Sequence, residues 1–390
     1  MRLLIAGGGT GGHIYPALAV ARSLREADTR DGGPPELSWI GGRRGLEAQL
    51  VPPAGIPLRR LMLRSLRTVD VNVHTVTDPL RLAASVPQAA AILARERPAA
   101  IFTTGGYVAV PVLIAAAPLR IPVVLWDGNV IPGRAVRLTA RLADVITVSY
   151  QATCEALASS AGEAPCYVTG TPIRDVRAID REAARVQLDV PAGERVMLIF
   201  GGSQAVRRFN AAVAGALPQL VEKATVIHVA GPDGYAAALA GREALPEPVR
   251  GRYRPYPFLR DEMLPALAAA DLVVGRAGSS TLAEATAFGL PLVVVPYPHA
   301  AGHQKANARE LVEAGAARVI DDEAFDAAAL LDAATLLDDA AAHLEMSAAA
   351  RSLGRPGAAE AVAGLVLAAA ERRRLPDPET IERVSRGVGA

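Results

Sequence analysis

The 390-residue sequence is poor in cysteine and in aromatic residues, with two cysteines and 4% Phe, Trp and Tyr. The cysteines, Cys154 and Cys166, form no C-x-x-C pair. A chain of this length buries enough apolar surface to fold without a covalent bridge, and disulfides are characteristic of small secreted domains. We therefore expect both cysteines to be reduced, in neither a disulfide nor a metal site.

The sequence also lacks an excess of charge of either sign and an unbroken apolar run that could span a membrane. Lys and Arg total 41 against 40 Asp and Glu, a net charge of +1, so we expect no nucleic-acid partner. The longest apolar region, residues 108–126, contains three prolines and Arg120, unlike a membrane-spanning helix. The apolar run before the first glycines is too short for a signal peptide, so a cytoplasmic location is expected.

Short apolar runs alternate with longer Ala-rich stretches of helical spacing, which is typical of a parallel sheet covered by helices on both faces. The first half predicts strands over residues 2–6, 37–41, 100–104, 122–126 and 145–149. The second half predicts strands over residues 196–200, 225–231, 271–276, 291–297 and 317–321. The two halves begin alike, since LLIAGGGTGGH and MLIFGGSQAVRRFN each indicate a strand, a glycine turn and a helix. The sequence therefore predicts two Rossmann-like α/β units.

The boundary between the units is expected near residues 169–195, where prolines and charged residues interrupt the strand pattern. We predict a first domain over residues 1–172 and a second over 173–355. The remaining residues, 356–390, are predicted to form a C-terminal helix and a loose polar tail.

The opening glycine turn, AGGGTGGH, spells the G-x-G-x-x-G of a dinucleotide site. A nicotinamide site also needs a carboxylate at the end of the second strand to hold the ribose, but that strand runs into SWIGGRRG. Arg43 and Arg44 could instead bind an NADP phosphate, which keeps an oxidoreductase as one alternative. Thr10 and His13 at the helix start, with two further glycine turns downstream, favour a site for phosphate and sugar hydroxyls.

Seven motifs follow one another within residues 1–350: GGTGGHIYPALAVA, TTGGYVAVP, NVIPG, GTPIR, GGSQ, ADLVVGRAGSSTLAEATAFGLPLVVVPYP and HQKANA. With them the chain resembles the MurG family of peptidoglycan N-acetylglucosaminyltransferases. The resemblance implies an α/β protein of the GT-B fold, two Rossmann-like domains with parallel sheets facing a central cleft. It also implies inverting transfer of N-acetylglucosamine from UDP-GlcNAc to the 4-hydroxyl of undecaprenyl-diphospho-N-acetylmuramoyl-pentapeptide (lipid I), which gives lipid II.

By this resemblance the donor binds to one loop of the second half, formed by Ser279, Ser280, Thr281, Leu282, Ala283 and Glu284. The loop opens a helix after a strand, so free backbone N–H groups and the positive end of the helix dipole would face a diphosphate. The carboxylate of Glu284 could accept hydrogen bonds from both ribose hydroxyls. An ordinary helix cap with a solvated glutamate is the structural alternative.

The resemblance implies further donor contacts elsewhere in the chain, at Asn129, Arg174, Ser203, Leu259 and Gln304. Ser203 would touch a phosphate, and the fixed charge of Arg174 would stabilise the departing UDP. Leu259 lies where the family places the uracil, and Gln304 would hydrogen-bond the sugar. Arg174 could instead be an ordinary surface arginine, and Leu259 could instead only pack in the core.

Three other residues or pairs near the donor loop carry open interpretations. Arg276 fits a second phosphate-binding charge or a strand-end ion pair equally well, and Asn307 could cap or support its helix. Asp321 and Asp322 are expected in a solvated loop, and no D-x-D pair follows a strand. We therefore predict no metal and no cofactor, because helix dipoles, backbone donors and Arg174 can carry the leaving-group charge.

The acceptor is expected on the first half. The backbone amides of Thr10, Gly11 and Gly12 would approach a phosphate, and Gly105, Gly106 and Tyr107 would form a second close approach. His13 is the expected general base because imidazole titrates near neutrality. Asp127 is the other candidate for the general base, or it could orient His13. His13 could instead have no catalytic role and only order its loop.

A lipid acceptor implies a peripheral position on the inner face of the cell membrane. Arginines at positions 59, 60, 64, 67 and 81 cluster with leucines at 61, 63, 66, 80 and 82, and Arg134, Arg137 and Arg141 follow at helical spacing. Such a basic and apolar surface can bind anionic lipid. A solvated helix face with its leucines in the core is the alternative.

The chain departs from the family pattern at three places. It has WDGN, residues 126–129, where the family has HEQN, GGSQAV where the family has GGSQGA, and Thr171 in GTPIR where asparagine is common. Two alternatives therefore stay open: a related GT-B UDP-sugar transferase with another acceptor, and a UDP-sugar epimerase.

Overall fold

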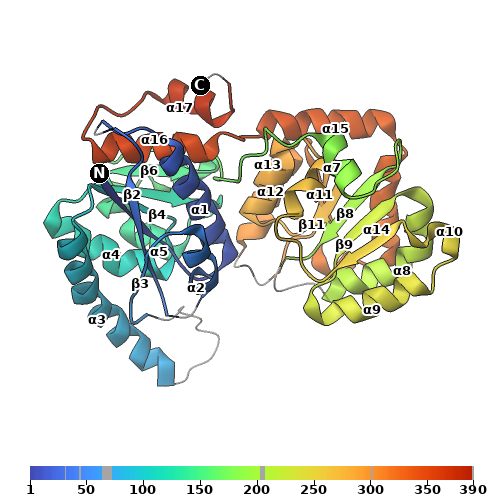
Figure 1. Ribbon diagram of the computed structural model, residues 1–390, viewed down its shortest axis with the longest axis horizontal. Coiled ribbons are helices and arrows are strands. Elements are labelled where there is room, and N and C mark those ends of the chain that lie inside the picture. Colours follow the sequence, from blue (N-terminus) through green and yellow to red (C-terminus); the bar gives the residue numbers. More distant parts are fainter. Residues whose placement is uncertain are drawn as a thin grey trace. The chain divides into compact units, whose positions relative to one another are not determined.

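The structure, a computed structural model, describes residues 1–30, 32–43, 45–63, 73–202, 207–298, 300 and 302–388, and side chains within 73–80 are left aside. The chain folds into two compact units (Figure 1). The first combines Met1–Asp175 with Arg355–Ala390, and the second is Val176–Gly354. The C-terminal segment that was predicted to stand apart thus belongs to the first unit.

The first unit is built on a seven-stranded sheet in the order β3-β2-β1-β4-β5-β6-β7, and every neighbouring pair is parallel. Its strands are β1 (Arg2–Ala6), β2 (Glu36–Gly41), β3 (Leu58–Arg60), β4 (Ala100–Thr103), β5 (Val123–Asp127), β6 (Val145–Val148) and β7 (Cys166–Val168). Its helices are α1 (Gly11–Glu26), α2 (Glu47–Leu50), α3 (Val73–Glu96), α4 (Gly106–Leu119), α5 (Arg134–Thr139), α6 (Gln151–Leu157), α16 (Ala358–Ala370) and α17 (Pro378–Ser385). All five predicted strands are present, whereas the short edge strands β3 and β7 were not predicted.

Both faces of this sheet are covered, because successive residues of a strand point to opposite sides. Leu3 and Ile5 pack with α1 and α16 on one face, and Leu4 and Ala6 pack with α3 and α4 on the other. All four side chains are at most 1% exposed. The near-continuous apolar strands predicted from the sequence therefore belong to a sheet buried on both faces.

The tail predicted to be loose is ordered against the first unit. Figure 1 shows α16 and α17 lying along that unit. Ile381 of α17 is 3% exposed within its core, and the hydroxyl of Tyr167 in β7 donates to the carbonyl of Pro376 at 3.0 Å. Arg355 pairs with Glu382 and also donates to the carbonyl of Val168. The expectation failed because the contacts of Pro376 and Arg355 with β7 join residues 209 and 187 positions apart, which no local pattern reveals.

The second unit is built on a six-stranded parallel sheet in the order β10-β9-β8-β11-β12-β13. Its strands are β8 (Val196–Phe200), β9 (Thr225–Val229), β10 (Tyr253–Tyr256), β11 (Leu272–Gly275), β12 (Leu292–Val294) and β13 (Ala317–Val319). Its helices are α7 (Arg181–Gln187), α8 (Arg207–Lys223), α9 (Pro232–Glu243), α10 (Glu247–Arg250), α11 (Met263–Ala269), α12 (Ser279–Ala287), α13 (His303–Glu313), α14 (Ala327–Ala334) and α15 (Ala340–Leu353). The five predicted strands are present, and β10 was missed because its sequence, YRPY, places an arginine and a proline in an edge strand.

The prediction that both cysteines are reduced is wrong. Cys154 in α6 and Cys166 at the start of β7 form a disulfide, with their Cα atoms 5.9 Å apart. Helix α6 packs against the edge strand β7, and this packing brings together two side chains that are 12 residues apart in the sequence. A chain of this length does not need a disulfide in order to fold, but its length does not prevent one from forming.

One helical stretch among the described residues, Ala340–Ala370, is long and apolar enough to cross a membrane by length and composition. It consists of α15 and α16, and 67% of its most apolar window is buried inside the fold. Core helices meet the same criterion. The apolar region noted in the sequence, residues 108–126, instead divides into most of α4 and most of β5.

The buried tail predicts a measurable loss on truncating one side chain. Ile381→Ala is expected to lower the free energy of unfolding by about 2–4 kcal/mol, because it removes core atoms from a site that cannot fully collapse. Urea denaturation measures this change. The matched control is Val388→Ala, because Val388 is 62% exposed near the same end of the chain. An Ile381 variant as stable as this control would show that the tail does not contribute to the core.

Candidate functional site

In each sheet the strand order reverses at one central strand, so that strands later in the chain lie on both sides of it. In the first unit β1 lies between β2 and β4, and in the second unit β8 lies between β9 and β11. Loops that follow the strands on either side of such a point diverge and leave a crevice at the carboxyl edge of the sheet, where open α/β proteins bind ligands. The predicted residues that the structure describes lie at or beyond the carboxyl ends of strands, some beside these central strands and others farther along the same sheets.

In the first unit the glycine turn leads from β1 directly into α1. Thr10 is the N-cap residue, but its side chain makes no capping hydrogen bond. Its carbonyl accepts the amides of His13 at 3.1 Å and Ile14 at 3.3 Å, which closes the first turn. Within the described part of the chain, no acceptor contacts the amides of Gly11 and Gly12. These two N–H groups and the helix dipole therefore suit an anion.

His13 is held across the crevice by the loop that follows β4. Its Nδ1 lies 2.8 Å from the carbonyl oxygen of Thr104. A carbonyl only accepts, so Nδ1 carries the proton in this contact and Nε2 of the neutral ring keeps its lone pair. Gly106 lies close by, since a Cβ built on it would be 3.6 Å from Nε2. Gly105 and Gly106 have φ of 75° and 74°, a conformation that favours glycine.

Asp127 at the end of β5 is 5% exposed, and both of its carboxylate oxygens accept backbone amides. Oδ1 accepts the amide of Asn129 at 2.9 Å, and Oδ2 accepts the amide of Gly133 at 3.1 Å. Burial raises the pKa of Asp127, while these amides and the charge of His13 oppose the rise. The carboxylate thus orders the loop that presents Asn129, whose carbonyl accepts the hydroxyl of Thr153.

Glu47, which was not predicted from the sequence, is a fully buried carboxylate at the same edge. It accepts the amide of Gly9 at 3.0 Å and that of Gly42 at 2.8 Å. Gly9 is the second glycine of G-x-G-x-x-G, the one that lets a pyrophosphate approach in dinucleotide sites. Because a carboxylate of the protein occupies that amide, the geometry argues against the oxidoreductase alternative. The available signal was an acidic residue directly after the glycine-rich turn GGRRGL; Arg44 of that turn lies outside the described residues.

Tyr107 completes this edge. Burial and the charge of Glu47 raise the pKa of Tyr107, so its hydroxyl stays protonated. A Cβ built on Gly42 would meet that hydroxyl at 2.5 Å, and one built on Gly9 would meet the ring at 3.3 Å. Tyr107 therefore packs directly on two glycine turns. Arg174 is partly buried in the coil between β7 and α7, at the end of the first unit.

In the second unit the predicted donor loop follows β11 and begins α12. Gly278 is the N-cap and supplies no side-chain cap, so the segment from Ser279 to Thr281 forms a first turn with backbone donors at the carboxyl edge. Leu282 is 1% exposed and anchors the turn, while Ala283 and Glu284 are partly exposed. The hydroxyl of Ser280 is buried without a hydrogen-bond partner among the described residues.

Asn307 of α13 contacts the segment that leads from β11 into this loop. It is fully buried, and its Nδ2 donates to the carbonyl of Ala277 at 3.4 Å. Gln304 of the same helix uses its Oε1 to accept the amide of Tyr297 at 2.9 Å. Its amide nitrogen is therefore the part that can donate to a ligand. Leu259 is 4% exposed, and Ser203 lies outside the described residues.

Of its two predicted roles, Arg276 has that of an ion-pair partner at the end of a strand. It is 6% exposed, its Nη1 lies 2.5 Å from Asp322, and the rings of Phe209 and Tyr297 pack against its guanidinium. Asp322 also pairs with Arg208 at 3.2 Å. The expectation of a solvated Asp321–Asp322 loop is therefore wrong for Asp322, because its partners come from elements far away in the sequence.

The predicted basic and apolar surface divides in the structure. Leu61 and Leu63 are buried, at 0% and 3% exposure, so these two leucines belong to the core. Arg59 is exposed and pairs with Glu96 at 3.0 Å. Arg64, Leu66 and Arg67 and the side chain of Leu80 lie outside the described residues. Arg134, Arg137 and Arg141 are exposed on and just after α5.

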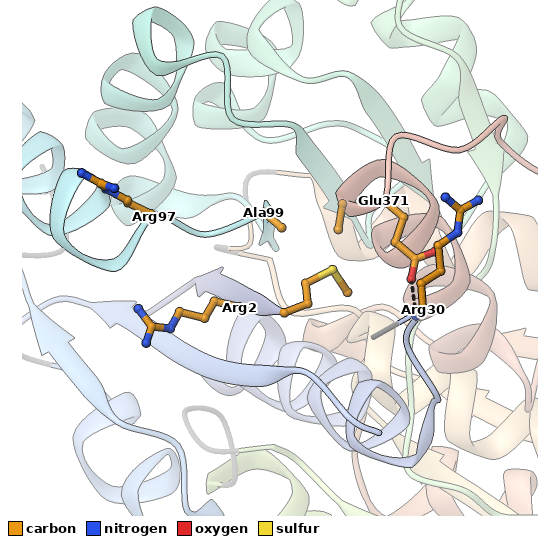
Figure 2. Close-up of a pocket in the computed structure, with 7 residues that line it drawn as sticks. Arg2, Arg30, Arg97, Ala99 and Glu371 are labelled. Atoms are coloured by element: carbon orange, nitrogen blue, oxygen red, sulfur yellow. Dashed lines mark hydrogen bonds and ion pairs between the residues drawn. The ribbon is translucent and has the colours of Figure 1, made fainter. Parts of the chain in front are cut away.

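The cavity drawn in Figure 2 lies at another place in the first unit. It has a volume of about 430 Å³ and is lined by Met1, Arg2, Arg30, Arg97, Ala99, Ala370 and Glu371. These residues border the amino ends of β1 and β4, opposite the glycine turns. Arg2 pairs with Glu36, and Arg30 pairs with Glu371. None of the predicted site residues lines this cavity.

Comparison with known proteins agrees with this geometry. The N-terminal domain of glycosyltransferase family 28 matches residues 3–148, and the C-terminal domain of the same family matches residues 196–362. Two parallel-sheet α/β units with these domains define a glycosyltransferase of the GT-B fold.

A curated relative from Moorella thermoacetica, UDP-N-acetylglucosamine:N-acetylmuramyl-(pentapeptide) pyrophosphoryl-undecaprenol N-acetylglucosamine transferase, is 39% identical over 95% of this chain and 100% of its own length. The solved structure of Acinetobacter baumannii MurG superposes with a TM-score of 0.72 at 27% identity, covering 94% of this chain and 98% of that one. The chain therefore belongs to the MurG family. A UDP-GlcNAc 2-epimerase from Neisseria meningitidis, solved with bound UDP-GlcNAc, has a TM-score of 0.64 at 12% identity, covering 96% of this chain and 100% of that one, a likeness of fold alone.

The contacts of Asp127 predict that its two acceptor oxygens stabilise the loop that follows β5. Asp127→Asn would direct an amide NH₂ at one of the two backbone N–H groups, leaving a buried donor unsatisfied. We expect the free energy of unfolding to fall by about 1–3 kcal/mol, measured by urea denaturation. Asp28→Asn, at an exposed position of the same unit, is the control. Equal stability of the two variants would show that the carboxylate does not order the Asn129 loop.

Proposed function

We propose that this protein transfers N-acetylglucosamine from UDP-GlcNAc to the 4-hydroxyl of lipid I and so makes lipid II. The observation that carries this proposal is the 39% identity, over nearly the whole chain, to a transferase whose name states that donor and acceptor. Further curated relatives at 34–36% identity carry the same name. The two carboxyl-edge loop clusters supply the groups that such a reaction needs.

The donor would bind to the second unit. The first turn of α12 offers backbone amides and a positive dipole end to the diphosphate, and Glu284 one turn on would accept the ribose hydroxyls. Gln304 would act as a donor to a sugar hydroxyl, because its oxygen already accepts the amide of Tyr297. The backbone near Leu259 would face the uracil, and Ser203 would contact a phosphate.

The acceptor would bind to the first unit, with its diphosphate at the amides of Gly11 and Gly12. Nε2 of His13 would take the proton of the 4-hydroxyl as the oxygen attacks the anomeric carbon. The new bond forms on the face opposite the leaving group, so the configuration inverts and UDP departs with its electron pair. Asp127 would hold the Asn129 loop against the donor sugar, and Arg174 would stabilise the charge of UDP.

The segment WDGN keeps a transferase with another acceptor as the second candidate. The donor loop of such an enzyme could be identical, so donor binding does not separate the two. Turnover of lipid I does.

The assay that tests the proposal follows UDP release from UDP-GlcNAc with and without a short-chain lipid I analogue. We expect release to depend on the acceptor. His13→Ala should lower turnover by about 100-fold or more, the usual scale for losing a general base, with donor affinity within about twofold of the wild type. UDP-GlcNAc binding without acceptor-dependent release would favour the other acceptor, and near-normal turnover of the variant would remove His13 from the role of base.

We also propose that the first unit binds the membrane surface peripherally, through neighbouring helices α4 and α5. Ile114 and Leu119 are each 44% exposed and Leu138 is 59% exposed. Arg134 and Arg137 are exposed on α5, the helix that carries Leu138. Exposed apolar side chains rimmed by arginines favour reversible binding to anionic lipid.

Vesicle flotation tests this surface. Leu138→Asp should reduce binding to vesicles containing anionic phospholipid by about tenfold, since it removes apolar burial and adds a repelled charge. The matched control is Leu344→Asp, because Leu344 is 68% exposed in the second unit. Equal binding of the two variants would contradict a membrane contact through α5.

A further inference from the structure

We propose that Glu47 is a positioning residue of the acceptor half-site, which holds the Gly9 turn and, through it, His13. This inference rests on the proposed function for its kinetic part. Glu47 is a buried carboxylate that has no role in donor binding, acceptor binding or proton transfer as proposed above.

The carboxylate of Glu47 joins two loops of the carboxyl edge. Oε2 accepts the amide of Gly9, in the loop after β1, and Oε1 accepts the amide of Gly42, in the loop after β2. The side chain is 0% exposed, so solvent does not compete for these bonds. Charge-assisted hydrogen bonds to backbone amides are stronger than neutral ones, and they satisfy the buried charge.

The surrounding glycines leave the space that this carboxylate occupies. A Cβ built on Gly8 would lie 2.7 Å from Oε1, and one built on Gly41 would lie 2.8 Å from Cγ. A Cβ on Gly45 would collide with Oε2. Glycines of both loops are therefore needed for the carboxylate to reach the Gly9 amide. These glycines thus make room for a side chain of the protein itself and not only for a ligand.

Leu46 and Glu47 together form hydrogen bonds with both backbone polar groups of Gly9. Glu47 accepts its amide, and the amide of Leu46 donates to its carbonyl at 3.3 Å. Gly9 has φ of 100°, and the next residue, Thr10, starts α1 by accepting the amide of His13. Fixing Gly9 from both sides therefore fixes the turn from which His13 projects.

The contact also determines which amides remain for a ligand. Because the Gly9 amide donates to Glu47, it is not available to a phosphate, whereas the amides farther along, at Gly11 and Gly12, have no acceptor among the described residues. Those amides belong to the same helical turn as His13. The carboxylate thus directs an anionic acceptor away from the start of the glycine turn and toward the proposed base.

Hydrogen exchange tests the structural part without any substrate. In Glu47→Gln an amide NH₂ must face one of the two backbone donors, so we expect amides within residues 7–14 to exchange at least about tenfold faster. Residues 279–288 of the second unit should be unchanged. Glu36→Gln, at an exposed carboxylate that begins β2, is the control and should match the wild type. Unchanged exchange over residues 7–14 in Glu47→Gln would overturn the proposal.

A double-mutant cycle tests the action through His13. On the lipid I analogue, Glu47→Gln should lower kcat by about 10- to 100-fold, the cost of a misplaced catalytic group, with the KM for UDP-GlcNAc within about twofold. The double variant Glu47→Gln/His13→Ala should be no slower than His13→Ala alone. Normal kcat in Glu47→Gln, or losses that multiply, would overturn the proposal. An inactive wild type would instead contradict the proposed function, and the exchange measurement would still decide whether Glu47 holds the turn.

Discussion

Parallel strand pairing is the constraint on which both half-sites depend. Because every strand of a sheet runs in the same direction, every loop that leaves a strand at its carboxyl end lies on one edge. In the first unit this brings together three loops, those after β1, β2 and β4, which are separated by tens of residues in sequence. The bond from His13 to Thr104 and the two bonds of Glu47 join these loops directly. The site is therefore a property of the sheet edge rather than of any single motif.

Buried carboxylates at this edge bind the backbone, and this distinguishes them from His13, for which we propose a catalytic role. Asp127 and Glu47 each use both oxygens to accept backbone amides. His13, in contrast, uses one ring nitrogen to hold its position, and we propose that the other accepts the proton of the acceptor hydroxyl. In the second unit Asp322 neutralises Arg276 at the strand end, and the N-cap of α12, Gly278, has no side chain that could cap the first turn. These contacts are consistent with the helix N-termini as the groups that we propose bind a diphosphate.

The sequence predicted the architecture well, because buried parallel strands are apolar runs that any local window can recognise. All ten predicted strands are present, and the missed ones are edge strands of three or four residues, such as YRPY in β10. The failures share one cause. The Cys154–Cys166 bridge, the packing of Ile381 and the pairing of Asp322 all depend on contacts between different elements. Glu47 escaped notice for the same reason, since a glutamate near glycines acquires its meaning only when the loop after β2 folds onto the loop after β1. The predicted roles of the donor residues stay predictions.

The measurement that tests the central claim most directly is the identification of the product formed from UDP-GlcNAc and a short-chain lipid I analogue by nuclear magnetic resonance. The account predicts a disaccharide in which N-acetylglucosamine is joined through an inverted anomeric carbon to the 4-hydroxyl of the muramoyl residue. Recovery of unmodified lipid I analogue, with UDP-GlcNAc converted to its C2 epimer in the absence of any acceptor, would contradict it.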